Sequence, residues 1–157
     1  MFCTDVKDKR IIDAVKAANI IFRDSEFLQL IGNHEGFDMS TTPSAQIAFY
    51  LETTLELDCI EVKLFRPKWP WSKVYAMFKS REPRSIYLSS RRLNRDEDAF
   101  GNMCSIVGSI AHEYVHLVDN RLSKHSFGHG NNDSRGKGNT APYRIGELAK
   151  WFIYDGE

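Results

Sequence analysis

The longest helical pattern in the chain runs from about Asp96 to Asn120, and it limits the fold more than any other feature. Its two flanks are apolar at helical spacing: Ile106, Ile110 and Leu117 on one flank, and Val107, Ala111, Val115 and Val118 on the other. A helix that is apolar on both flanks is buried on both, so the remaining elements must cover it. A single polar stripe remains on this helix, made of Ser105, Ser109, His112, His116 and Asp119.

The other segments predict a small sheet and several helices. Apolar spacing indicates helices over residues 8–23, 43–56 and 140–152, and strands over 59–65, 74–78 and 85–89; the apolar pattern of the first helix continues over residues 26–31. No repeat or linker divides the chain. The order of elements predicts an α+β fold in a single domain, residues 1–157, with a small mixed sheet packed against helices around the central helix.

The charges and the cysteines limit the class of partner. With 21 basic and 21 acidic residues the formal net charge is zero, so no nucleic acid partner is expected. No apolar stretch is long enough to span a membrane, and the charged N-terminal segment does not resemble a signal peptide. Cys3, Cys59 and Cys104 form no C-x-x-C pair, so we expect no disulfide framework and a reducing compartment. The default expectation is a cytoplasmic protein, although a dedicated secretion system can export a chain without these signals.

The central helix carries the pattern His112-Glu113-Tyr114-Val115-His116, an H-E-x-x-H motif. Residues four apart lie on the same face of a helix, one turn from each other. Two imidazoles in that arrangement can bind one zinc ion, at Zn–N distances of ~2.0–2.1 Å. Glu113 lies at the edge of the same face, where it can reach a water molecule without occupying a coordination position.

A structural metal in a non-catalytic binding module is the alternative interpretation. Structural zinc usually has four protein ligands and favours Cys, and it has no need of a carboxylate such as Glu113. A chance match to so short a motif is a further risk, which the helical setting with apolar flanks reduces. The motif therefore favours a catalytic metal site.

The motif resembles that of the zincin metallopeptidases. The resemblance implies that His112 and His116 bind Zn²⁺ and that Glu113 is the general base in hydrolysis of peptide bonds. The metzincin subclass is excluded, because Asp119 and Leu122 stand where that subclass has Gly and His. More loosely, Gly128–Asn132 and Thr140–Glu147 resemble the zinc-peptidase toxin domains of bacterial secretion effectors, which implies an effector or toxin.

Catalytic zinc needs a third protein ligand, and the sequence leaves its identity open. Gluzincins, a zincin subclass, use a glutamate on a later helix, and Glu147 occupies such a place 31 residues after His116. The same glutamate also fits an exposed ion pair on its own helix. The rival ligands are His125, His129 and Asp133. Asp119, one turn beyond His116, can instead accept an imidazole N–H or serve as a polar residue at the end of the helix.

The expected substrate is a peptide or protein, and the expected oxyanion donors are Tyr143 and His129, whose alternatives are packing and solvation. Ser85–Ser89 precedes the central helix, where zincins have the edge strand that holds an extended substrate; its alternative role is an ordinary strand of the sheet. Trp69 and Trp71 can line a cleft, pack in the core or anchor their loop. An amidase that cuts peptidoglycan stem peptides or another amide, as in a bacterial effector, uses the same chemistry and remains an alternative. The oligomeric state is not predicted.

Overall fold

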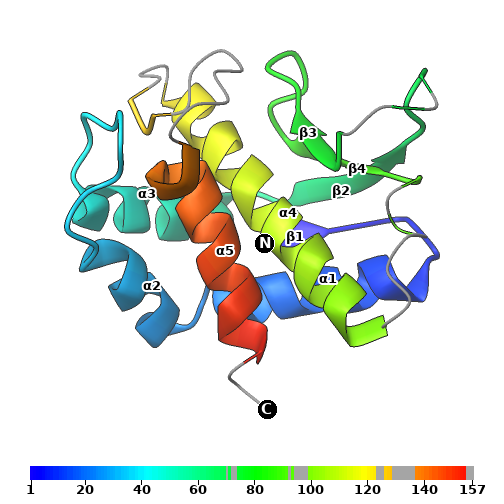
Figure 1. The fold of residues 1–157 in the computed structure, drawn as a ribbon, viewed down its shortest axis with the longest axis horizontal. Helices are drawn as coiled ribbons and strands as arrows, with labels where there is room; N and C mark the ends of the chain where they lie inside the picture. Colours follow the sequence, from blue (N-terminus) through cyan, green and yellow to red (C-terminus); the bar gives the residue numbers. More distant parts are fainter. Residues whose placement is uncertain are drawn as a thin grey trace.

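The structure is a computed structural model that describes residues 1–69, 71, 74–91, 93, 99–122, 126–128 and 137–154 (Figure 1). The described helices are α1 (Lys9–Ile21), α2 (Ser25–Gly32), α3 (Ser44–Leu57), α4 (Ala99–Arg121) and α5 (Ala141–Tyr154). The described strands are β1 (Phe2–Cys3), β2 (Ile60–Phe65), β3 (Ala76–Phe78) and β4 (Ser85–Ser89), and a short 3₁₀ helix, Lys137–Asn139, precedes α5. The α+β prediction is confirmed. Of these elements, β1 and the 3₁₀ helix were not predicted, and α2 was not predicted as a helix separate from α1.

The four strands form one mixed sheet in the order β1-β2-β4-β3. β1 pairs parallel with β2, and β2 pairs parallel with β4. β3 runs antiparallel to β4. The prediction that Ser85–Ser89 forms an exposed edge is therefore wrong, because β4 pairs on both sides and all five of its residues are buried. The edge on that side is β3, whose short sequence Ala76–Phe78 carries a weaker strand signal.

Helix α4 occupies the centre of the fold, as its two apolar flanks require. It packs against α1, α3, α5, β3 and β4, and in Figure 1 it crosses the molecule between the sheet and α5. Tyr114 on α4 is fully buried among Phe2 and Phe22, with ring centroids 5.0 and 5.1 Å away. Its hydroxyl donates to the carbonyl oxygen of Leu51 at 2.6 Å, which satisfies the one polar group that this burial removes from water.

The helices begin in two different ways. Asp8 and Asp24 precede α1 and α2, and their carboxylates accept backbone N–H groups of the first turn. Pro43 precedes α3 and provides no side-chain cap, so the start of α3 depends on other groups to satisfy its N–H donors.

A disulfide joins Cys3 in β1 to Cys59 just before β2, with their Cα atoms 6.1 Å apart. No framework of several disulfides was expected, and this single bond was not predicted, because only the parallel pairing of β1 with β2 brings the two distant cysteines together. The cysteine spacing therefore no longer supports a reducing compartment. Cys104 is buried in α4 without a disulfide. Among the described residues, no helix combines the length and apolar character needed to cross a membrane.

Candidate active site

Helix α4 presents His112 and His116 on its one polar stripe. Both imidazoles are partly exposed, with ring centroids 5.0 Å apart and an angle of 67° between the ring planes. The flanking positions are buried, so the helix cannot rotate to turn the stripe inward without exposing its apolar flanks. Two neighbouring imidazoles are a donor set that suits zinc, so the residues present fit such an ion.

Glu113 lies beside this stripe but is only 9% exposed. Burial raises the pKa of its carboxyl group from the ordinary 4.5 to about 7, because the charged form loses contact with water. The backbone N–H of Phe78, the last residue of β3, donates to the carboxylate and opposes part of this increase. A carboxyl group that titrates near neutral pH is well matched to proton transfer.

Helix α5 packs beside the histidine stripe of α4. Tyr143, in its first turn, places its ring edge-on to that of His112, with centroids 4.6 Å apart and planes at 82°. The two helices cross where Gly108 meets Gly146: a Cβ at Gly146 would lie 2.9 Å from the carbonyl oxygen of Gly108 and 3.3 Å from the Cβ of His112. Both glycines are thus needed for the backbone of α5 to approach the motif.

Glu147 follows Gly146 directly, and it lies one turn beyond Tyr143 on the same face of α5. Its side chain is exposed. Within the described residues, no three His, Cys, Asp or Glu side chains are grouped as a metal site would group them. Glu147 therefore lies on the helix that packs beside His112, and its role as third ligand stays a prediction.

The three rival ligands, His125, His129 and Asp133, lie outside the described residues. Asp119, by contrast, has a clear partner. It is 7% exposed and accepts the backbone N–H of Ser126 at 2.8 Å, so it ties the segment after α4 back onto the helix. The sequence shows an acidic residue one turn after His116. The spacing does not predict its hydrogen bond with Ser126, because Ser126 lies beyond the end of α4.

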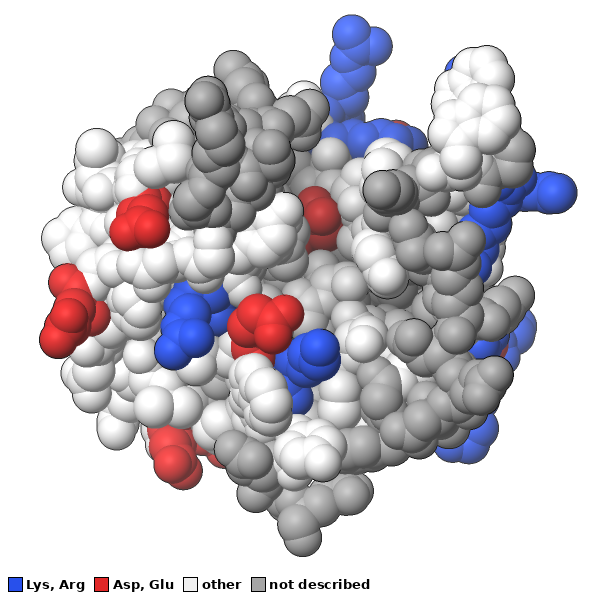
Figure 2. Space-filling view, in the orientation of Figure 1, with Lys and Arg blue, Asp and Glu red and all other residues white. Residues whose placement is uncertain are grey.

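Trp69 and Trp71 are 63% and 73% exposed, and their rings stack with centroids 5.4 Å apart. They are therefore not part of the core, and their exposed rings can line a cleft or anchor their loop. Figure 2 shows charged side chains of both signs dispersed over one face of the molecule, with uncharged surface between them. The described residues of that face form no extended patch of a single sign.

Two contacts of the site were missed from the sequence. The hydrogen bond between Phe78 and Glu113 depends on β3 being the edge strand, which the weak pattern of residues 74–78 does not indicate. The close contact of Gly108 with Gly146 did leave a signal, since a glycine inside a helix that is otherwise well formed usually marks close packing.

Comparison of the chain with models of known protein families, with curated proteins and with solved structures gives no match. The functional argument therefore depends on the geometry of α4, α5 and β3.

Proposed function

We propose that this protein is a zinc-dependent metallopeptidase whose metal is held by His112 and His116. The observation that carries the proposal is the joint placement of three groups on one helix: two imidazoles with centroids 5.0 Å apart, and the buried carboxyl group of Glu113 beside them. A solvated helix face would leave the burial of Glu113 unexplained, because acidic side chains are mostly exposed. A buried carboxyl group whose pKa is raised to about 7 beside two imidazoles is typical of a functional site.

Zinc bound there would act as a Lewis acid, lowering the pKa of a water molecule and polarising a carbonyl group. Glu113 accepts the proton of the attacking water and then donates it to the amine that leaves. The hydrogen bond from Phe78 holds the carboxylate in place for this transfer. Tyr143 lies against His112, and its hydroxyl is the candidate donor to the tetrahedral oxyanion. His129 is kept as the second candidate donor.

We assign the third ligand to Glu147. Two facts support it: Glu147 shares a face of α5 with Tyr143, whose ring contacts His112, and it follows Gly146, which packs against His112. Two imidazoles and one carboxylate form a ligand set that catalytic zinc uses, with a fourth position left for water.

The outer edge of β3, the edge that does not pair with β4, suits an extended peptide. Ser89 N–H donates to the carbonyl of Tyr75 at 2.8 Å, so residue 75 directs its backbone groups to β4. Because this direction alternates along an antiparallel strand, Ala76 and Phe78 direct theirs to the other edge, where Glu113 accepts the N–H of Phe78 and the backbone groups of Ala76 face outward. The bond from Phe78 to Glu113 places that edge beside the catalytic carboxylate. A substrate that adds as a further strand would therefore pass the site.

The test combines metal analysis with cleavage of a peptide library. The zinc-loaded protein is expected to cleave peptides, and Glu113→Gln to keep its zinc but lose at least ~10²-fold in kcat. His116→Ala is expected to lose most of its zinc. Unchanged hydrolysis by the Gln variant would contradict the mechanism. Activity on peptidoglycan stem peptides or another amide, with none on the library, would move the assignment to the amidase alternative.

A further inference from the structure

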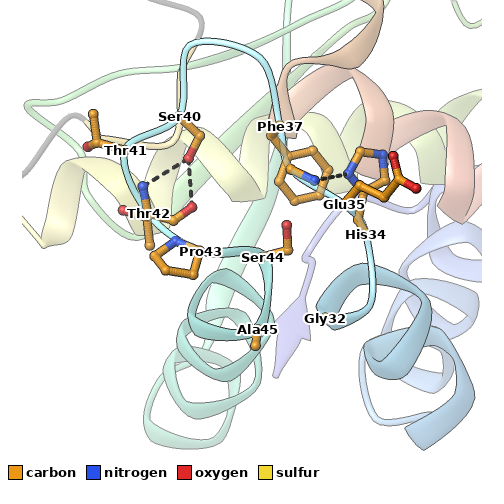
Figure 3. Close-up of a pocket in the computed structure, with 11 residues that line it drawn as sticks. Gly32, His34, Glu35, Phe37, Ser40, Thr41, Thr42, Pro43, Ser44 and Ala45 are labelled. Atoms are coloured by element: carbon orange, nitrogen blue, oxygen red, sulfur yellow. Dashed lines mark hydrogen bonds between the residues drawn. The ribbon is translucent and has the colours of Figure 1, made fainter.

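A pocket distant from α4 in sequence lies where α2 ends and α3 begins. Residues 33–43 form an arch between these helices, and under it lies a cavity of about 410 Å³ (Figure 3). Most of its lining is polar or small: Gly32, His34, Glu35, Gly36, Phe37, Ser40, Thr41, Thr42, Pro43, Ser44 and Ala45. We call this the α3 pocket. Its volume is in the range of ~300–1,000 Å³ that small-molecule sites have.

The start of α3 presents unpaired N–H donors to this pocket. Gln46 and Ile47 donate to the carbonyl oxygen of Pro43, but within the described ranges the N–H groups of Ser44 and Ala45 have no acceptor. In α1 and α2 a capping carboxylate accepts N–H groups of the first turn, whereas Pro43 offers α3 no side-chain acceptor. The positive end of a 14-residue helix thus opens into the cavity.

The hydroxyl of Ser44 is a second, independent sign of a missing partner. Ser44 is only 6% exposed, and its Oγ atom has no hydrogen-bond partner in the part of the chain that the structure describes. Figure 3 shows this hydroxyl pointing from the first turn of α3 into the arch, toward Phe37. A buried hydroxyl is almost always hydrogen-bonded, so an unpaired one at the floor of a cavity points to a ligand.

The side chains at the far end of the arch define what else the ligand meets. His34 stacks on Phe37, with ring centroids 4.4 Å apart, and its Nδ1 atom accepts the N–H of Gly36 at 3.2 Å. The neutral ring therefore carries its proton on Nε2, where it can donate. Glu35 is exposed at the same end, and its carboxylate opposes a highly charged anion.

We propose that the α3 pocket binds the oxyanion group, a carboxylate or a phosphate, of a small organic molecule. The N–H groups of Ser44 and Ala45 and the Ser44 hydroxyl are three donors in the first turn of one helix, and an oxyanion can accept all three. The rest of the cavity accommodates the organic part. This site needs no zinc and goes beyond the proposed peptidase function.

Hydrogen bonds connect the arch over the α3 pocket to helix α4 through Ser126. Thr41 N–H donates to the carbonyl oxygen of Ser126 at 2.8 Å, and the hydroxyls of Thr42 and Ser126 lie 2.7 Å apart. Ser126 in turn donates its N–H to Asp119 on α4. The amide of Ser126 therefore reports whether occupation of the pocket reaches the end of α4.

The test is an NMR titration of the full chain with ¹⁵N-labelled amides. Inorganic phosphate and N-acetylglycine are added separately, with sodium chloride at matched ionic strength as control. The amides of Ser44 and Ala45 are expected to shift with a saturable curve in at least one of the two anions and not in chloride. Saturation by phosphate alone, or by N-acetylglycine alone, identifies the anion. No saturable shift at these two amides with either anion would overturn the proposal.

Ser44→Ala tests the hydroxyl while keeping both N–H donors. A hydrogen bond to a charged group supplies enough binding energy that the variant should bind the anion roughly tenfold to hundredfold more weakly. Ser25→Ala is the matched control, since Ser25 is also the first residue of a helix but is exposed, and Asp24 caps that helix. Glu35→Gln should strengthen binding by removing a negative charge. Equal affinity in Ser44→Ala and the unmodified protein would overturn the role of the hydroxyl.

Discussion

Replacing Glu113 by Gln should change the pH dependence of stability in the metal-free protein. The carboxyl group is only 9% exposed, and burial raises its pKa from 4.5 to about 7. Gln has nearly the same shape, can still accept the N–H of Phe78, and never becomes charged. The variant therefore isolates the cost of ionising this buried group.

The sign of this pH dependence follows from the number of protons that the folded and unfolded states bind. Between pH 4.5 and about 7 the folded protein keeps a proton on Glu113 that the unfolded chain has already released, so the free energy of unfolding falls as pH rises. Below this window the two proteins should be about equally stable. Above it the difference is constant. At about 1.4 kcal/mol per pH unit, the interval from 4.5 to about 7 corresponds to about 3 kcal/mol in favour of the variant.

The assay is urea unfolding of both proteins in a chelator, at half-unit steps from pH 4 to pH 8.5. Glu56→Gln, an exposed glutamate on α3, serves as the control and should follow the unmodified protein at every pH. A stability difference between Glu113→Gln and the unmodified protein that does not grow between pH 4.5 and 7 would refute the reasoning. So would a variant that is less stable at pH 8.

The remaining predictions concern the helix crossing, the segment after α4 and the metal. Gly146→Ala should lower the free energy of unfolding by about 1–3 kcal/mol in urea titrations, because its Cβ would lie 2.9 Å from the carbonyl oxygen of Gly108. The control Gly138→Ala should leave the free energy of unfolding unchanged, because the space around Gly138 is open. Asp119→Ala should cost about 1–3 kcal/mol and speed hydrogen exchange at the amide of Ser126, which loses its acceptor; unchanged exchange there would contradict this. Complete removal of metal by a chelator should abolish peptide cleavage and zinc should restore it, so activity without metal would contradict the proposed function.

The helical part of the fold could be predicted well because its signals are local. Apolar residues recur at helical spacing along α1, α3, α4 and α5, and the two apolar flanks of α4 already require a central position. The same helix determines the relative placement of His112, Glu113 and His116, so three residues of the candidate site follow from one element.

The parts that depend on pairing between distant segments could not be predicted. In the observed strand order β4 lies inside the sheet and β3 lies at its edge. The sequence of a short strand does not indicate which strands it pairs with, so this order could not be predicted. The bond between Cys3 and Cys59 depends on the same pairing. The burial of Glu113 also needed the structure, because a period of 3.6 places it near the polar stripe without showing that β3 covers it.

The central claim is that His112 and His116 bind one zinc ion. The most direct test is a crystal grown with zinc and measured on both sides of the zinc absorption edge. The proposal predicts an anomalous peak about 2.0–2.1 Å from one nitrogen of each ring. A zinc-loaded crystal with no peak between the two rings, or with its peak bound by other residues, would contradict it.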